Sequence, residues 1–192
     1  MSRFSQVNFL LSAARAAQFP ADVGAEVAFV GRSNAGKSSA INAITQRQGL
    51  ARTSKTPGRT QLLNFFELAP GKRLVDLPGY GYAEVTAAQR RAWQPLIEAL
   101  RERESLRGLF VIVDARRGVR EGDEALLEWA GPGRRLHVLL SKCDKLSARE
   151  ARAALSAAGE ALGTRAGVQL FSALRGSGVA EARDTLASWL GV

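Results

Sequence analysis

The sequence has few of the residues and segments that build disulfide frameworks, zinc sites or membrane anchors. A single cysteine, Cys143, excludes an internal disulfide and gives no zinc pattern. No apolar run reaches the roughly 18 to 20 residues that a membrane-spanning helix needs. The start of the chain also lacks the long apolar stretch of a secretory signal. We therefore expect a protein of a reducing compartment, the cytoplasm.

Acidic residues are in short supply, and the imbalance is uneven along the chain. The formal net charge is +9. Residues 1–60 hold eight Lys/Arg against Asp22 and Glu26, which leaves +6 there and +3 in the rest of the chain. Two interpretations stay open. The excess is either a solvated basic face or a surface for a polyanion such as RNA, and the one-sided distribution favours RNA.

A chain of 192 residues has room for one compact α/β domain. Short apolar runs alternate with longer helix-like segments, which predicts a mostly parallel sheet with helices on both faces. We expect residues 1–22 to be an N-terminal extension packed on or flanking the domain and residues 23–192 to be the domain itself. The expected strands are 27–31, 62–68, 73–77, 109–114, 136–141 and 168–172, and the expected helices are 37–46, 86–103, 123–130, 148–162 and 179–190.

A phosphate-binding loop lies between the first expected strand and the first expected helix. Its GxxxxGKS pattern is complete, and its backbone N–H groups are expected to surround the β-phosphate of a nucleotide. Lys37 can bridge the β- and γ-phosphate oxygens, and the Ser38 hydroxyl can coordinate Mg²⁺. The loop consists of Gly31, Arg32, Ser33, Asn34, Ala35, Gly36, Lys37 and Ser38.

A second motif, Asp76-Leu77-Pro78-Gly79, ends the third expected strand. The Asp76 carboxylate can hold Mg²⁺ through a water molecule, and the Gly79 N–H can reach a γ-phosphate. Such a turn alone is weak support, but at this distance after a phosphate loop it supports a nucleotide hydrolase.

The motif Ser141-Lys142-Cys143-Asp144 predicts that the base is guanine. An aspartate at the end of a strand can accept hydrogen bonds from guanine N1–H and the exocyclic amine, which adenine does not offer in this arrangement, and such sites discriminate by roughly 10⁴-fold or more. The Lys142 stem can cover the purine face. Phe171-Ser172-Ala173 can supply the Ala173 N–H to guanine O6. GTP is therefore the expected nucleotide.

A threonine in the loop after the first expected helix is expected to sense the γ-phosphate. Thr60 is preferred to Thr53 and Thr56 because it adjoins the next strand. It can give its hydroxyl to Mg²⁺ and its N–H to the γ-phosphate only when GTP is bound, and loss of that phosphate releases the loop.

The segments GRSNAGKSSAINAI, SKTPGRTQLLNFF, DLPGYGYA, SKCD and FSA together resemble the EngB (YihA/YsxC) family of bacterial GTP-binding proteins, from about Phe9 to the C-terminus. The resemblance implies a Ras-like domain with six strands, bound GTP or GDP with Mg²⁺, and roles in large ribosomal subunit maturation and in cell division and septation. It also implies that Ser38 and Thr60 are the Mg²⁺ ligands and that nucleotide contacts come from Gly58, Arg59, Thr60, Gln61 and Leu62. One departure is Ser141, where the family usually has Thr or Asn.

The residue that orients the attacking water is not evident. Tyr80 follows Gly79, where Ras-type enzymes have a glutamine, so Lys37, Thr60 and Gly79 are the expected catalytic groups and intrinsic turnover is expected to be slow. Asn34 is a candidate K⁺ ligand, because a cation near it would supply positive charge beside the phosphates. The alternative is that Asn34 only braces the loop.

Some residues keep two interpretations. Arg90-Arg91 and Arg116-Arg117 either contact RNA or are solvated, whereas His137 is expected to be core or sheet filler. Two other functions also remain possible: a nucleotide-stabilised RNA-binding module with negligible hydrolysis, and a GTPase whose basic face meets acidic lipid. The favoured interpretation is a monomeric GTPase switch that binds a ribosomal precursor.

Overall fold

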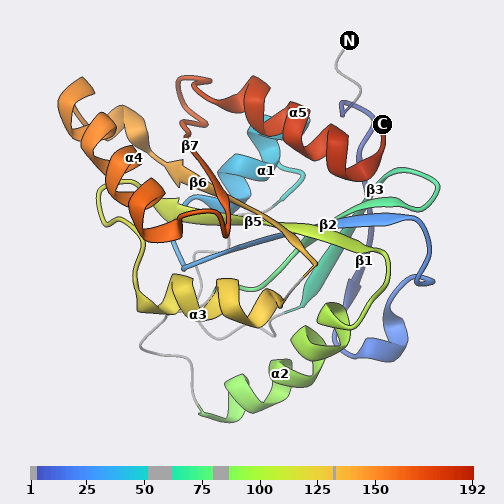
Figure 1. The fold of residues 1–192 in the computed structure, drawn as a ribbon. Helices are drawn as coiled ribbons and strands as arrows, with labels where there is room; N and C mark the ends of the chain where they lie inside the picture. The colour runs from blue at the N-terminus through green and yellow to red at the C-terminus, as the bar shows by residue number, and fades with distance from the viewer. Residues whose placement is uncertain (1–3, 52–61, 80–86, 132) are drawn as a thin grey trace.

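The structure is a computed structural model that describes residues 4–51, 62–79, 87–131 and 133–192. Seven strands form one sheet in the order β1-β3-β4-β2-β5-β6-β7 (Figure 1). Strands β2, β4, β5, β6 and β7 run parallel to one another, and β3 is antiparallel to both β1 and β4. The strands are β1 (Asn8–Ala13), β2 (Ala25–Gly31), β3 (Leu63–Ala69), β4 (Lys72–Asp76), β5 (Leu106–Asp114), β6 (Arg135–Ser141) and β7 (Gly167–Leu170).

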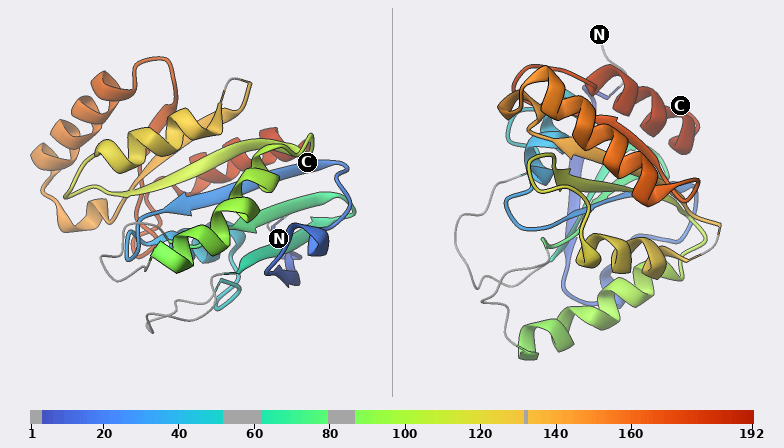
Figure 2. Two further views of the ribbon diagram at one scale, coloured as in Figure 1. Left: turned by 90° about the horizontal axis from the view of Figure 1, so that it is seen from below. Right: turned by 60° about the vertical axis from the view of Figure 1, so that its left-hand side comes forward.

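Five α-helices in the described parts of the chain cover the two faces of the sheet. Side chains of α1 and α5 pack in one hydrophobic cluster, and those of α2, α3 and α4 pack in the other. Figure 1 shows α1 and α5 above the sheet with α2 and α3 below it, and Figure 2 gives the arrangement from two further directions. The helices are α1 (Lys37–Thr45), α2 (Ala87–Arg101), α3 (Glu121–Ala130), α4 (Ala148–Leu162) and α5 (Val179–Leu190). The predicted α/β architecture is confirmed.

The central strands are buried on both faces, as their sequences indicate. All seven residues of β2 are buried, and so are eight of the nine residues of β5. Continuous apolar runs of this kind are typical of parallel strands that helices cover on each side. The turn Pro70-Gly71, in which Gly71 has φ +71°, joins β3 to β4 in the predicted hairpin.

The sheet has one strand more than the predicted six. The extra strand is β1, which pairs with β3 at the edge and shows a register shift between Phe9 and Leu11. Only Ala13 of this strand is fully buried. An edge strand with an irregular register and exposed side chains lacks the alternation that marks a strand in sequence, which explains why the pattern missed it.

A buried ion cluster fixes the amino-terminal end of β2, opposite the loops that follow the strands. Glu26 is fully buried and accepts hydrogen bonds from Arg73 Nη1 at 3.1 Å and Arg103 Nε at 2.7 Å. Asp22 accepts from the Ser105 amide at 2.9 Å, which ties the segment before β2 to the start of β5. No helix among the described residues is long and apolar enough to cross a membrane.

Candidate functional site

The predicted site residues that the structure describes lie at one edge of the sheet. Gly31, Asp76 and Ser141 are the last residues of β2, β4 and β6, and Phe171 follows directly after β7. Because these four strands are parallel, their carboxyl ends meet at the same edge, where ligands of open α/β sheets bind.

The phosphate loop joins β2 to α1 with a backbone that depends on glycine at two points. A Cβ on Gly31 would lie 2.7 Å from the Ile112 carbonyl oxygen of β5, so this strand end has no room for a side chain. Gly36 has φ +100° and caps α1, a conformation that L side chains rarely adopt. Lys37 and Ser38 are therefore the first two residues of α1, and the loop's backbone precedes a helix N-terminus, where anions bind.

Lys37, the first residue of α1, forms an ion pair with Asp76, the last residue of β4. Their side chains are only 13% and 8% exposed, so each is the main counter-charge of the other. The Leu77 amide donates to the Phe29 carbonyl at 3.0 Å, which extends the β4 pairing beyond the strand. A Cβ on Gly79 would lie 3.2 Å from Ser33 Cα. The Asp76–Gly79 segment thus lies directly against the phosphate loop.

The base-recognition loop is connected to the phosphate loop by two side chains. The Ser141 hydroxyl donates to the Ala35 carbonyl, and Lys142 Nζ donates to the Asn34 carbonyl. Lys142 itself adopts a left-handed conformation, with φ +58°. Ser141 therefore provides a hydroxyl contact between the two loops.

Asp144 is held in place by the segment that follows β7. Ser172 is fully buried, and its hydroxyl donates to Asp144 Oδ1 at 2.5 Å. This hydrogen bond is the main reason that the pKa of Asp144 is lowered, so the carboxyl group is ionised at neutral pH. The Cys143 amide donates to the Phe171 carbonyl at 3.2 Å, and Ala173 packs against the core. The two predicted base segments are therefore adjacent.

Sequence reasoning missed Asp114, the last residue of β5. Its Oδ2 accepts hydrogen bonds from Lys142 Nζ at 3.1 Å and Arg116 Nη2 at 2.7 Å, and its Oδ1 accepts from Arg116 Nε at 2.9 Å. Arg116, followed by Lys142, lowers the pKa of this carboxyl group far below its ordinary value. The signal was available, because an aspartate that ends a buried strand lies at the same edge as Asp76 and Ser141.

Part of the predicted site lies outside the described residues, namely Gly58, Arg59, Thr60, Gln61 and Tyr80. Leu62 is described and directly precedes β3. Asn34 is exposed and has φ +60°, so the loop backbone turns sharply at this residue. The roles given to these residues stay predictions.

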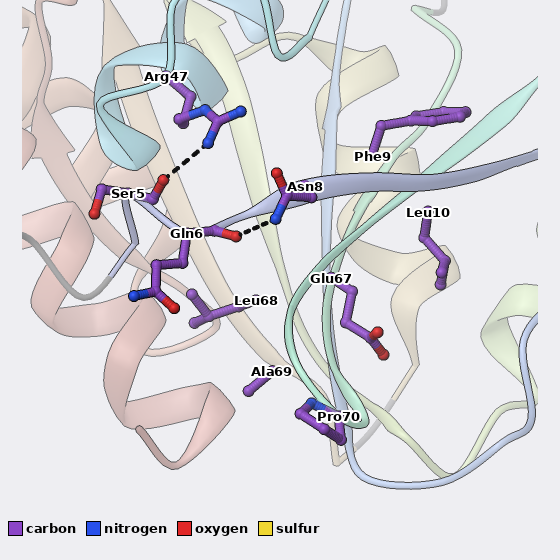
Figure 3. A pocket seen from close by; sticks show the side chains of 10 residues that line it. All are labelled: Ser5, Gln6, Asn8, Phe9, Leu10, Arg47, Glu67, Leu68, Ala69 and Pro70. Carbon is purple, nitrogen blue, oxygen red and sulfur yellow. Dashed lines mark hydrogen bonds between the residues drawn. The ribbon is translucent and has the colours of Figure 1, made fainter.

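A hollow of about 600 Å³ lies at the β1–β3 edge of the sheet, and none of the predicted site residues lines it. Figure 3 shows that it is lined by the N-terminal segment, the β3–β4 hairpin and Arg47. Arg47 Nη1 donates to the Ser5 carbonyl at 3.0 Å, so this arginine holds the N-terminal segment against the end of α1 (Figure 3). Among the basic residues of 1–60, Arg47 therefore contacts the protein itself rather than only solvent or a partner.

The oxygen atoms beside the phosphate loop suit Mg²⁺, a metal that also takes ligands from water and from substrate phosphates. No group of three or more His, Cys, Asp or Glu residues in the described parts of the chain could hold a metal ion. Mg²⁺ usually keeps several waters and binds through one or two protein oxygens together with substrate phosphates. Ser38 and Asp76, beside the phosphate loop, fit that pattern.

Comparison with known proteins agrees with this geometry. Residues 26–142 match the family model described as "50S ribosome-binding GTPase". The chain is 51% identical to "Probable GTP-binding protein EngB" of Aromatoleum aromaticum, covering 100% of this chain and 91% of the relative. It is 49% identical to the Escherichia coli protein of the same name, covering 97% and 91%.

A solved structure, that of a probable GTP-binding protein EngB, aligns with a TM-score of 0.66 at 20% identity and covers 87% of this chain and 99% of that chain. At that identity the match supports the fold alone, whereas the sequence relatives establish the family. The chain is a P-loop GTPase, and it belongs to the EngB family of GTP-binding proteins.

Proposed function

We propose that this GTPase is a nucleotide-controlled switch whose GTP form binds the large ribosomal subunit or its precursor, with a consequent role in cell division and septation. The observation that carries the nucleotide part is the joining of the phosphate loop to the base-recognition loop through Ser141 and Lys142. The ribosomal part rests on the family to which residues 26–142 belong and on the net charge of +9.

The residues around the phosphate loop take the roles predicted from their motifs. Lys37 contacts the β- and γ-phosphates, and the loop amides surround the β-phosphate. Lys37 and Asp76 neutralise each other in the structure. When nucleotide binds, the phosphates become the counter-charge of Lys37. The Asp76 carboxylate is then available for a water molecule of the Mg²⁺ shell.

The metal would be held by Ser38 and Thr60 directly and by Asp76 through water. Bound there, Mg²⁺ supplies positive charge to the β- and γ-phosphate oxygens. The Gly79 amide and Thr60 contact the γ-phosphate when GTP is bound. Hydrolysis removes these contacts, and their loss switches the protein from its GTP form to its GDP form. The base is read by Asp144, which the Ser172 hydroxyl orients.

Turnover without a partner is slow in this proposal, because none of the motif side chains is an evident base for the attacking water. A K⁺ ion near Asn34 is a separate hypothesis for how positive charge is added. Equal turnover in K⁺ and Na⁺ salts, with ribosomal subunits present, would refute it.

Co-sedimentation with purified ribosomal subunits tests the proposed partner. The protein should pellet with large subunits in the presence of a non-hydrolysable GTP analogue, and less with GDP or without nucleotide. Single-turnover hydrolysis should rise when large subunits are added. Equal pelleting in all three nucleotide states would contradict a switch, and unchanged hydrolysis would favour a binding module with a structural nucleotide.

Acidic lipid is the alternative partner for the basic face. Sedimentation with vesicles that contain phosphatidylserine separates the two. Binding to those vesicles at physiological salt, without binding to subunits, would replace the ribosomal proposal.

A further inference from the structure

A basic surface lies between the phosphate loop and the start of α3. It surrounds a hollow of about 170 Å³ that borders the carboxyl ends of β2, β5 and β6. Five cationic residues and two acidic residues line this hollow, which leaves a formal charge of +3. The cations are Arg32, Arg116, Arg117, Arg120 and Lys142, and the acids are Asp114 and Asp123.

The side chains that reach the surface are the cations, because both acids are buried beneath them and offset part of their charge. Asp114 is 7% exposed and Asp123 is 1% exposed. Asp114 accepts from Arg116 and Lys142, and Asp123 Oδ2 accepts from the Arg120 amide at 3.0 Å. Arg116, Arg117 and Arg120 are exposed. Glu121, the first residue of α3, is an exposed acid next to them, and Asp144 also attracts Arg116.

The arginines stand on a backbone that is already ordered. The amides of Arg117 and Gly118 both donate to the Asp114 carbonyl, at 2.9 and 3.2 Å, and this closes a tight turn at the end of β5. Val119 packs against the core. Arg120 Nε donates to the Arg117 carbonyl at 3.4 Å. A fixed backbone lowers the entropy that binding would otherwise cost.

Arg116 is the best oriented of the group. Asp114 engages its Nε–H and one Nη2–H, which are two of the five donors of a guanidinium, while the side chain stays 47% exposed. The donors of the opposite edge point away from Asp114. A planar fork held in this way suits a phosphate oxygen pair better than a flexible lysine does.

We propose that the surface formed by Arg32, Arg116, Arg117 and Arg120 docks the phosphodiester backbone of RNA beside the nucleotide site. The proposal rests on the proposed ribosomal function and adds the place of contact. Of the two interpretations of Arg116-Arg117, it takes contact with RNA. The docked strand would lie next to the nucleotide site, because a chain of contacts connects Arg116 to the phosphate loop. Asp114 contacts both Arg116 and Lys142, and Lys142 contacts the Asn34 carbonyl.

The test removes two charges that have no part in the nucleotide site. Arg117→Gln with Arg120→Gln is compared with Arg149→Gln and Arg152→Gln, a double change of equal charge at exposed positions of α4. Both proteins should bind GDP as the wild type does. Affinity for large subunits and for protein-free large-subunit rRNA is measured by titration over a range of salt.

We expect the first variant to bind rRNA about 20-fold more weakly at 0.15 M salt and to lose about 1.6 from the slope of log K against log salt, since each phosphate contact contributes about 0.7 to 0.9. The control should match the wild type. Equal losses in both variants, or none in the first, would overturn this surface while leaving subunit binding intact. Loss with whole subunits but not with protein-free rRNA would point to a ribosomal protein and overturn the RNA proposal. If the wild type bound neither probe, the proposed function itself would fail.

Discussion

Removing the Ser172 hydroxyl should weaken guanine binding through its effect on Asp144. The hydroxyl donates to Asp144 Oδ1 at 2.5 Å and accepts from the Arg175 amide at 3.1 Å, in a fully buried position. In the wild type, the carboxylate is therefore oriented before the base arrives. In Ser172→Ala, the Asp144 side chain becomes ordered only when the nucleotide binds.

The expected loss follows from that ordering. Fixing one side chain on binding costs about 0.5 to 1.5 kcal/mol, so GDP affinity should fall roughly 2- to 13-fold. Protein stability should fall as well, by about 1 to 3 kcal/mol, because a hydrogen bond to a charged group is lost and the Arg175 amide loses its acceptor.

Titration with GDP and with IDP, which lacks the exocyclic amine, is the assay. GDP uses both carboxylate oxygens and IDP uses one, so GDP should lose more affinity than IDP. Ser156→Ala is the control, because it removes an exposed hydroxyl that donates to Glu160 at 3.1 Å on α4. Equal losses for GDP and IDP, or GDP affinity unchanged from the wild type, would refute the reasoning.

Three further predictions concern stability. His137 is the only histidine, and burial lowers its pKa below 6.5. The unfolded chain therefore binds more protons than the folded protein, and the melting temperature should fall as pH drops from 7.5 to 5.5. In His137→Gln this pH dependence should flatten, and an unchanged dependence would contradict the prediction. Gly108→Ala would bring a methyl 2.6 Å from the Trp189 ring and should cost about 1 to 3 kcal/mol in denaturant unfolding. Gly159→Ala on α4 would place its methyl 4.0 Å from Val168 of β7 and should stabilise the protein by about 0.5 to 1 kcal/mol; the reverse order would contradict the packing. Lys37→Ala should destabilise the nucleotide-free protein by about 3 kcal/mol, since it leaves Asp76 buried and unpaired, and a melting curve like that of the wild type would argue against the pair.

The parts of the fold that the sequence predicted are those with a strong local signal. The helix Ala148–Leu162 was predicted with its observed bounds, and its Ser147 cap accepts from the Glu150 amide. The buried strand β5 was recognised from its apolar run, although it begins three residues earlier, at Leu106. Strand β1 was missed because it is an edge strand whose paired residues in β3 lie 50 or more residues away in sequence.

The site divides in the same way. Motif spacing predicted that Lys37, Asp76 and Asp144 would lie at one edge of the sheet, and parallel strands bring them there. Spacing could not predict the contacts between motifs. The Asp114 carboxylate meets Lys142 across a separation of 28 residues, and the Ser172 hydroxyl meets Asp144 across another 28. Such contacts depend on which strands are neighbours, and a single sequence does not state that directly.

The central claim is that this chain recognises guanine through Asp144. Exchange of one carboxylate oxygen of this residue for an amide NH₂ group tests it most directly. Asp144→Asn should bind GDP on the order of 10⁴-fold more weakly than the wild type and should gain affinity for xanthosine diphosphate, because the amide donates to the carbonyl that replaces the guanine amine. Asp184→Asn, an exposed change on α5, should leave both affinities as they are. Binding of GDP by Asp144→Asn as tight as that of the wild type would contradict the account.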